Sequence, residues 1–243
     1  MKEFDQLQKT RIDKPFADEG EALKTGINGW SKLVMDGYGF EGDSDFQKEQ
    51  FDIEFGQTEG QTKKILVYSF LGKIVASIGF VENESLLEKA RTFNVHGIVV
   101  SPVLKGFGVG SALYENAINE FDVEILVGKT KNPSAVVARA NGAARMGMRT
   151  FYGEYEVTPN LFGKSDYGSF LANKYLEQRK TYIKGDGLIV LTDITILPPN
   201  IPDVTLFPKE IAKAFTPIIE QQKKLGDKDT ATLPLISIKK IGK

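Results

Sequence analysis

The sequence predicts a mixed α/β (α+β) fold with a largely antiparallel central sheet, flanking helices and a C-terminal extension. Two observations carry this prediction. Residues 63–81 contain two apolar segments joined by a Leu-Gly pair, which is typical of a β-hairpin. Residues 92–157 then alternate between apolar runs and segments of helical periodicity, which indicates a strand–helix–strand–helix–strand order.

The composition indicates a folded protein and excludes several kinds of site. The 243 residues are 41% hydrophobic and 26% charged, which suffices for a core. A net charge of −1 argues against a globally basic nucleic-acid surface. The absence of cysteine excludes disulfides, zinc thiolate sites and cysteine nucleophiles, and the single histidine, His96, excludes a multi-histidine metal site. We therefore expect no metal.

Three segments are expected along the chain. Residues 1–57 contain a helix from about residue 18 to residue 34, and residues 58–160 form the core. Residues 161–243 are an extension that completes or elaborates the sheet, ending in "LISIKKIGK", which we interpret as an edge strand. The start lacks the apolar stretch of a signal peptide, and no run has the length of a membrane span. We therefore expect a cytoplasmic protein.

The core begins with strands. In the second half of the hairpin, the apolar residues Ile74, Ala76, Ile78 and Phe80 recur at every second position, as in a strand. Residues 92–100, "TFNVHGIVV", are rich in β-branched residues and predict the next strand.

Two helices follow these strands. Apolar residues recur every four positions over residues 108–121, which predicts an amphipathic helix. Residues 123–128 are a short buried strand. The pair Asn132-Pro133 starts a second helix, to about residue 146, because asparagine caps free amides and proline suits the first helical position.

The junction between the strand at 92–100 and the first helix is the most informative stretch. Its sequence is "KGFGVG", from Lys105 to Gly110. The first amides of a helix lack internal partners and lie at the positive end of the helix dipole, and glycines let a bulky anion approach the backbone. A phosphate or diphosphate is the natural ligand. The spacing fits neither a P-loop nor the G-x-G-x-x-G dinucleotide fingerprint.

This junction resembles the Q/R-x-x-G-x-G/A pyrophosphate loop of the GNAT superfamily of N-acyltransferases. The strand "IVVSP" before it and the helix "NPSAVVARANGAARMGM" after it are similar to neighbouring motifs of that family. The resemblance implies transfer of acetyl from acetyl-CoA, or of another acyl group from its CoA thioester, to an amine by direct attack. It also implies these cofactor contacts: Ile98, Val99, Val100, Lys105, Gly106, Phe107, Gly108, Val109, Gly110, Ser111 and Asn132.

The sequence departs from the family pattern at two positions. Lys105 stands where the family has Gln or Arg, which keeps the charge but lacks the bidentate fork of arginine. Arg139 stands where the second motif often has a tyrosine, so the family's usual general acid is absent from this position. Arg139 and Arg145 are interpreted either as phosphate ligands or as surface residues.

Several residues are hypothesised to carry proton transfer. His96 is a general base by its reference pKa of about 6.5, with Glu82 and Glu84 as alternatives at the end of the neighbouring strand. Tyr152 or Tyr155 would replace the missing tyrosine as the acid. Each of these residues also has a plain structural interpretation, as a strand histidine, a solvated carboxylate or a sheet aromatic.

The resemblance implies a small-molecule or protein amine as the acceptor, and it assigns residues 1–57 to the acceptor-side helices of the fold. Trp30, Tyr38 and Phe40 are hypothesised to line the acceptor pocket unless they are core residues. Three alternatives stay open: a non-catalytic acyl-CoA-binding module, a GNAT-fold enzyme acting on nucleic acid or a modified base, and a different nucleotide binder. No membrane partner is expected, and the oligomeric state is open, with a homodimer among the options.

Overall fold

The computed structural model divides the chain into two compact units, which are described separately. The first unit comprises Met1–Glu84 and Phe93–Val123, and the second comprises Ser85–Thr92 and Glu124–Lys243. The structure describes residues 6–13, 16, 19–24, 29–38, 52, 55–56, 62–83, 85–87, 89–158, 162–179, 183–184, 188–191, 204–205, 207, 209–225 and 230–239.

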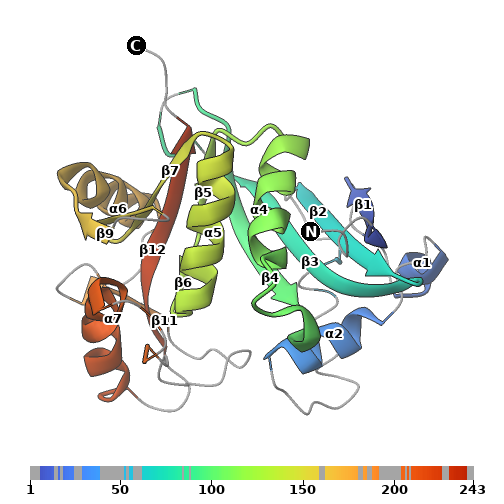
Figure 1. Ribbon diagram of the computed structural model, residues 1–243. Helices are drawn as coiled ribbons and strands as arrows, with labels where there is room; N and C mark the ends of the chain where they lie inside the picture. The colour runs from blue at the N-terminus through green and yellow to red at the C-terminus, as the bar shows by residue number, and fades with distance from the viewer. Residues whose placement is uncertain are drawn as a thin grey trace. The chain divides into compact units, whose positions relative to one another are not determined.

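The first unit is built on strands in the order β1-β2-β3-β4 (Figure 1). Their bounds are Gln8–Ile12, Lys63–Phe70, Lys73–Asn83 and Thr92–Val100. The β1–β2 and β2–β3 pairs are antiparallel. The unit also contains helices α1 (Glu19–Lys24), α2 (Trp30–Tyr38) and α4 (Val109–Glu120), and the short 3₁₀ helix η2 (Pro102–Leu104).

The predicted hairpin is confirmed. Leu71 and Gly72 join β2 to β3 with φ angles of 49° and 74°, and Phe70 pairs with Lys73 across the turn. Positive φ at both central residues matches the twist of a two-residue hairpin.

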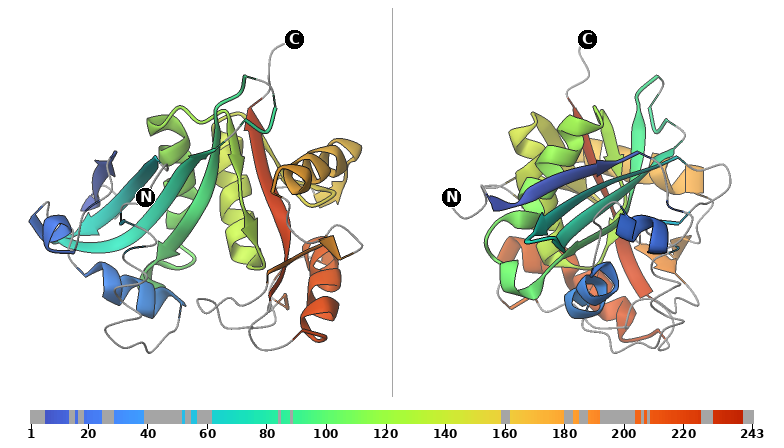
Figure 2. Two further views of the ribbon diagram at one scale, coloured as in Figure 1. Left: turned by 180° about the vertical axis from the view of Figure 1, so that it is seen from behind. Right: turned by 90° about the vertical axis from the view of Figure 1, so that its right-hand side faces the viewer.

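The two faces of this sheet carry different helices. On β2, Ile65 and Val67 belong to an apolar cluster that includes residues of α2. Tyr68, on the opposite side of the strand, bonds to a residue of α4. Figure 2 shows the strands from the side opposite α4, with α4 behind them in the left panel.

The single N-terminal helix predicted over residues 18–34 is not observed. Gly29 has a φ of 78°, which is not helical, and its carbonyl oxygen accepts the hydrogen bond from the amide of Leu33 that starts α2. The described residues of this segment therefore form two helices, because this glycine interrupts the apolar periodicity that predicted one.

The second unit places its C-terminal strand in the middle of a sheet. The strand order is β5-β12-β7-β8-β9, with bounds Ile125–Val127, Thr230–Lys239, Met148–Tyr152, Tyr155–Val157 and Phe162–Lys164. Strand β12 pairs antiparallel with both β5 and β7. The prediction of an edge strand here is therefore wrong. The apolar stretch "LPLIS" explains the placement, because it is buried on both faces.

Shorter strands and three helices complete the described part of this unit. Strand β6 (Lys129–Thr130) pairs with β12, as does β11 (Leu188–Leu191), which also pairs with β10 (Ile183–Lys184). The helices are α5 (Pro133–Arg145), α6 (Asp166–Arg179) and α7 (Lys209–Gln222).

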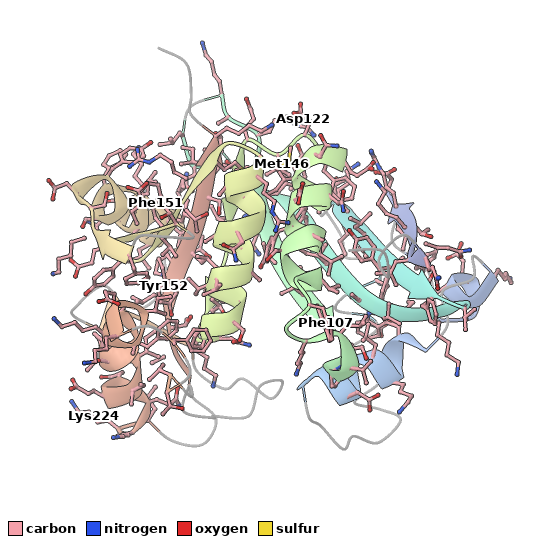
Figure 3. All side chains as sticks on the ribbon, viewed as in Figure 1. Phe107, Asp122, Met146, Phe151, Tyr152 and Lys224 are labelled. Carbon is pink, nitrogen blue, oxygen red and sulfur yellow. The ribbon has the colours of Figure 1, made fainter. Side chains whose placement is uncertain are left out.

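Alternation along β12 assigns these helices to two faces. Ile236 and Ile238 pack with Leu171 and Leu176 of α6. Leu233 and Leu235 pack with residues of α5 and α7. Adjacent residues of β7 divide in the same way, and Figure 3 labels Phe151 beside α6 and Tyr152 beside α7.

The predicted fold class, a mixed α/β fold with largely antiparallel sheet pairing and flanking helices, is confirmed. Among the described residues, no helix combines the length and apolar character needed to cross a bilayer. The division at residues 57 and 160 stays a prediction, and the two compact units divide the chain elsewhere.

Candidate functional site

The glycine loop between β4 and α4 has the conformation of an anion-binding turn. After η2 the chain passes through Gly106 with φ 86° and Gly108 with φ 82°, and α4 then begins at Val109. These φ values lie in the region that glycine adopts at little cost. Successive amides in such a turn point toward one side and form a concavity that favours anions.

The hydrogen bonds of the loop separate its amides into two groups. The amide of Lys105 donates to the carbonyl of Pro102 at 3.2 Å, and that of Phe107 donates to Leu104 at 3.4 Å. These two amides are therefore already hydrogen-bonded within the loop and are not available to a phosphate. Within the part of the chain that the structure describes, no acceptor is assigned to the remaining amides of the loop and first helical turn, which are those of Gly106, Gly108, Val109, Gly110 and Ser111.

The space beside these amides is open. A Cβ atom placed on Gly106 or Gly108 would meet nothing within 4 Å. Phe107, which Figure 3 labels at the start of α4, is 60% exposed. Gly108 is the N-cap of α4 but has no side chain to supply the capping bond. The open amides, the open space and the helix dipole together fit a phosphate or diphosphate.

The first half of α4 is held against the sheet by buried side chains and by a hydrogen bond from β2. Val109 and Leu113 are buried, and the Tyr68 hydroxyl on β2 donates to the Ala112 carbonyl at 3.3 Å. The Tyr68 oxygen also accepts a hydrogen bond from the Asn116 side chain, and burial raises its pKa. Sequence reasoning missed this pair, because no local pattern links residues 48 positions apart.

The last turn of α4 is tied to β1. Arg11 Nη1 donates to the carbonyl of Glu120 at 2.8 Å, and Lys9 forms an ion pair with the Glu120 carboxylate. The hydrogen bond from Lys9, followed by its charge, lowers the pKa of Glu120. Basic groups at a helix C-terminus complement the dipole there. Arg11 and Lys9 both bind the C-terminal end of α4, so the glycine loop at its N-terminal end stays accessible.

Strand β4 changes face along its length. The ring of Phe93 lies 6.3 Å from that of Phe80, which also contacts Phe121 just after α4. Val99 instead belongs to the cluster under α2. A regular strand would put residues six positions apart on one face, so β4 contains an irregularity between them. Of the predicted cofactor contacts on β4, Val99 is buried and Ile98 and Val100 are half-buried.

Lys105 does not point freely into solvent. Its Nζ donates to the carbonyl oxygen of Gly37, in the last turn of α2, at 3.3 Å. The lysine that replaces the family's Gln or Arg therefore links the loop to α2. The sequence offered no signal for this contact, because the two residues lie 68 positions apart.

The two hypothesised bases are both accessible. His96 on β4 and Glu82 near the end of β3 are exposed. Their roles as general bases stay predictions. The alternative Glu84 lies outside the described residues.

Tyr152 does not fit its predicted role as the general acid. It is fully buried in the second unit, its hydroxyl donates to the carbonyl of Thr130 at 2.8 Å, and its ring stacks on Phe215. Desolvation raises its pKa well above the usual value. Tyr152 is therefore a core aromatic of the sheet. Tyr155 is half-buried and stacks on Phe162, and burial also raises its pKa.

Arg139 occupies neither of its predicted settings. It is 1% exposed, so it is not a surface residue. Its Nε donates to Ser237 Oγ at 3.1 Å and its Nη2 donates to the Leu126 carbonyl, while Ser237 also bonds to Thr150. The guanidinium therefore joins α5 to β5 and β12 inside the second unit. Arg145 is exposed, as one of its two interpretations required.

Asn132 caps α5 as predicted. Its Oδ1 accepts the amide of Ser134 at 2.9 Å, and Pro133 follows at the first helical position. Since that oxygen is engaged, the Asn132 amide nitrogen is what remains for a cofactor, and that contact stays a prediction.

The acceptor-pocket hypothesis is corrected for Trp30. Its ring is 2% exposed and packs edge-on against Phe55 at 4.8 Å, which is core packing. The Tyr38 side chain and Phe40 lie outside the described residues. Within those residues, no group of three or more His, Cys, Asp or Glu could hold a metal ion.

Comparisons with known proteins bear on residues 28–145, which match the model of the Acetyltransferase (GNAT) family. The chain is similar to the solved structure of the ribosomal-protein-S18-alanine N-acetyltransferase from Escherichia coli, at 12% identity, covering 97% of each chain with a TM-score of 0.39. It is also similar to aminoglycoside 6'-acetyltransferase type Ii, at 12% identity, covering 94% of this chain and 96% of that one with a TM-score of 0.39. A search of curated proteins finds no match.

Proposed function

Because residues 28–145 belong to the acetyltransferase (GNAT) family, we propose that the protein is an N-acyltransferase that uses acetyl-CoA or another acyl-CoA and an amine acceptor. The observation that carries the proposal is the glycine loop. Its five amides without an assigned acceptor, in the described part of the chain, surround space that is open beside Gly106 and Gly108. This is where the resemblance places the diphosphate of CoA.

In this proposal the protein acts mainly by holding two reactants in line. The amine nitrogen bonds to the thioester carbonyl carbon, the carbon–sulfur bond breaks, and a proton passes from the nitrogen to solvent or a base while the thiolate takes one up. Freeing a protonated alkylamine of pKa about 10.4 at pH 7 costs roughly 4–5 kcal/mol. Correct positioning supplies roughly 7–11 kcal/mol. A base therefore needs only to assist.

The residues of the first unit have these proposed roles. The amides of Gly106, Gly108, Val109, Gly110 and Ser111 hold the diphosphate, and the backbone of Ile98 to Val100 pairs with the remainder of the CoA arm. The Val100 amide polarises the thioester carbonyl. His96 or Glu82 assists removal of the amine proton, which their exposure permits.

A second candidate function is a non-catalytic acyl-CoA-binding module. The observation in its favour is that Arg139 replaces the usual tyrosine and is buried, and an arginine does not release its proton near neutral pH. The other proposed acid, Tyr152, is buried as well. The leaving group of the reaction is the thiolate of CoA, whose thiol has a pKa of about 8.5. This thiolate would then have to take its proton from water or from Tyr155.

The test combines binding with turnover. Calorimetry should detect CoA binding to the purified protein, and CoA should raise its melting temperature. Incubation with acetyl-CoA and a panel of small amines and peptides with free N-termini should release free thiol with at least one acceptor. Binding without turnover on any acceptor would favour the module. Absence of CoA binding would contradict both functions.

A further inference from the structure

The side chain of Lys105 joins the glycine loop to the C-terminal end of α2. Its ammonium donates to the Gly37 carbonyl at 3.3 Å, and Gly37 is the second-last residue of α2. Carbonyl groups in the last turn of a helix lack intrahelical partners and form the negative end of its dipole. An ammonium group is therefore a suitable cap at this position.

Gly37 also lets α2 approach β4 closely. A Cβ atom at this position would lie 2.4 Å from Val99 Cγ2 and 3.6 Å from the carbonyl oxygen of Val100. Val99 is buried and β-branched, so its methyl group has little freedom to move away. The last turn of α2 thus packs on the part of β4 that is proposed to bind the CoA arm.

We propose that Lys105 is a positioning residue whose ammonium is shared between the bound diphosphate and the carbonyl end of α2, so that filling the loop also fixes α2. The inference rests on the proposed function. An ammonium has three donors. Among the described residues, the Gly37 oxygen is the acceptor assigned to this one, which leaves donors for a phosphate oxygen. The backbone amides still supply most of the phosphate binding.

This link has a consequence for the acceptor. Helix α2 belongs to residues 1–57, the segment that the family resemblance assigns to the acceptor side. If diphosphate binding holds the last turn of α2 against β4, the cofactor helps to place α2 before the amine arrives. Lys105 thereby couples the two substrates without touching the reacting atoms.

The test is hydrogen–deuterium exchange of amides 30–38 in the full chain, with and without saturating CoA. In the wild type, CoA should slow this exchange by about two- to fivefold, the factor that one exposed charged bond supplies. Lys105→Met should bind CoA within about fivefold of wild type, because the loop amides remain and an exposed ion pair contributes at most about 1 kcal/mol, but it should lose the slowing. Lys105→Arg should restore it.

A matched control is Lys24→Met, which removes the same charge from an exposed position at the end of α1. It should behave as wild type. Retention of the slowing in Lys105→Met would overturn the inference, as would wild-type CoA binding without any change at residues 30–38. If the wild type does not bind CoA, the proposed function fails first, and the two failures are thereby distinguished.

Discussion

The two helices that follow the strands of the core begin in opposite ways. Helix α5 starts at Asn132, whose side chain accepts the amide of Ser134, and Pro133 removes a further donor. Helix α4 starts at Gly108, which has a φ of 82° and no side chain to offer. One helix satisfies its own first amides, and the other has no acceptor for them among the described residues.

This difference distinguishes a structural helix start from a binding one. An N-terminus closed by its own cap gains stability and loses its attraction for anions. An N-terminus capped by glycine forgoes that stability, and the open space beside Gly106 and Gly108 keeps it accessible. The comparison therefore predicts that substitutions at the two starts will affect different properties, binding at α4 and folding at α5.

The largest effect is expected at α4. In Gly108→Ala the new Cβ enters the space proposed for the diphosphate, and a shift of φ from 82° turns the amides away. Loss of one or two hydrogen bonds to a charged oxygen weakens CoA binding by about 2–4 kcal/mol, or roughly 30- to 800-fold. Calorimetry on the folded variant measures this change.

Gly72→Ala is the matched control for that variant. Gly72 has a φ of 74° in the hairpin turn, and a Cβ there would also meet nothing within 4 Å. Both variants should lose about 1 kcal/mol of unfolding free energy from the left-handed backbone. Equal weakening of CoA binding in the two would show that the glycine loop does not bind the diphosphate.

A smaller effect is expected at α5, and on stability. Asn132→Ala removes the cap and should lower the free energy of unfolding by about 1 kcal/mol. Asn132→Ser, which keeps a capping oxygen, should recover most of the loss. Urea denaturation monitored by circular dichroism measures both variants, and an unchanged midpoint for Asn132→Ala would refute a structural role for this cap.

The smallest effect concerns the other end of α4. Arg11, which bonds to the Glu120 carbonyl, and secondarily Lys64 lower the pKa of Asp13. A carboxylate whose pKa is lower in the folded than in the unfolded protein stabilises the fold at any pH above its unfolded pKa of about 3.9. This stability is lost as the pH falls through the folded pKa. Arg11→Met should therefore lose a few tenths of a kcal/mol at pH 6, because the pair is exposed.

The pH dependence separates that ion pair from simple loss of packing. The stability difference between Arg11→Met and wild type should shrink as pH falls below the unfolded pKa of about 3.9 and through the lower folded pKa of Asp13. Thermal unfolding at several pH values measures it, with Arg11→Lys as the charge-keeping comparison. A difference that stays constant with pH would mean that Arg11 acts through its bond to the Glu120 carbonyl or its contact with Phe121 instead.

The sequence by itself determined the features that depend on neighbouring residues. The hairpin at Leu71-Gly72, the helix that starts at Val109 and the cap at Asn132 all follow from local periodicity and from the preferences of glycine, asparagine and proline. The glycine loop could be identified for the same reason, because positive φ and open amides are local properties of the chain.

Only the tertiary structure decided the features that join distant residues. The strand at the C-terminus lies between β5 and β7, Arg139 is buried against Ser237, and Lys105 reaches Gly37. The alternation that marks a strand does not say which strands will be its neighbours, and a charged residue in a helix pattern does not say what lies opposite it. Burial and long-range pairing depend on how the whole chain packs, and that packing converted a predicted edge strand into a central one and a predicted catalytic tyrosine into part of the core.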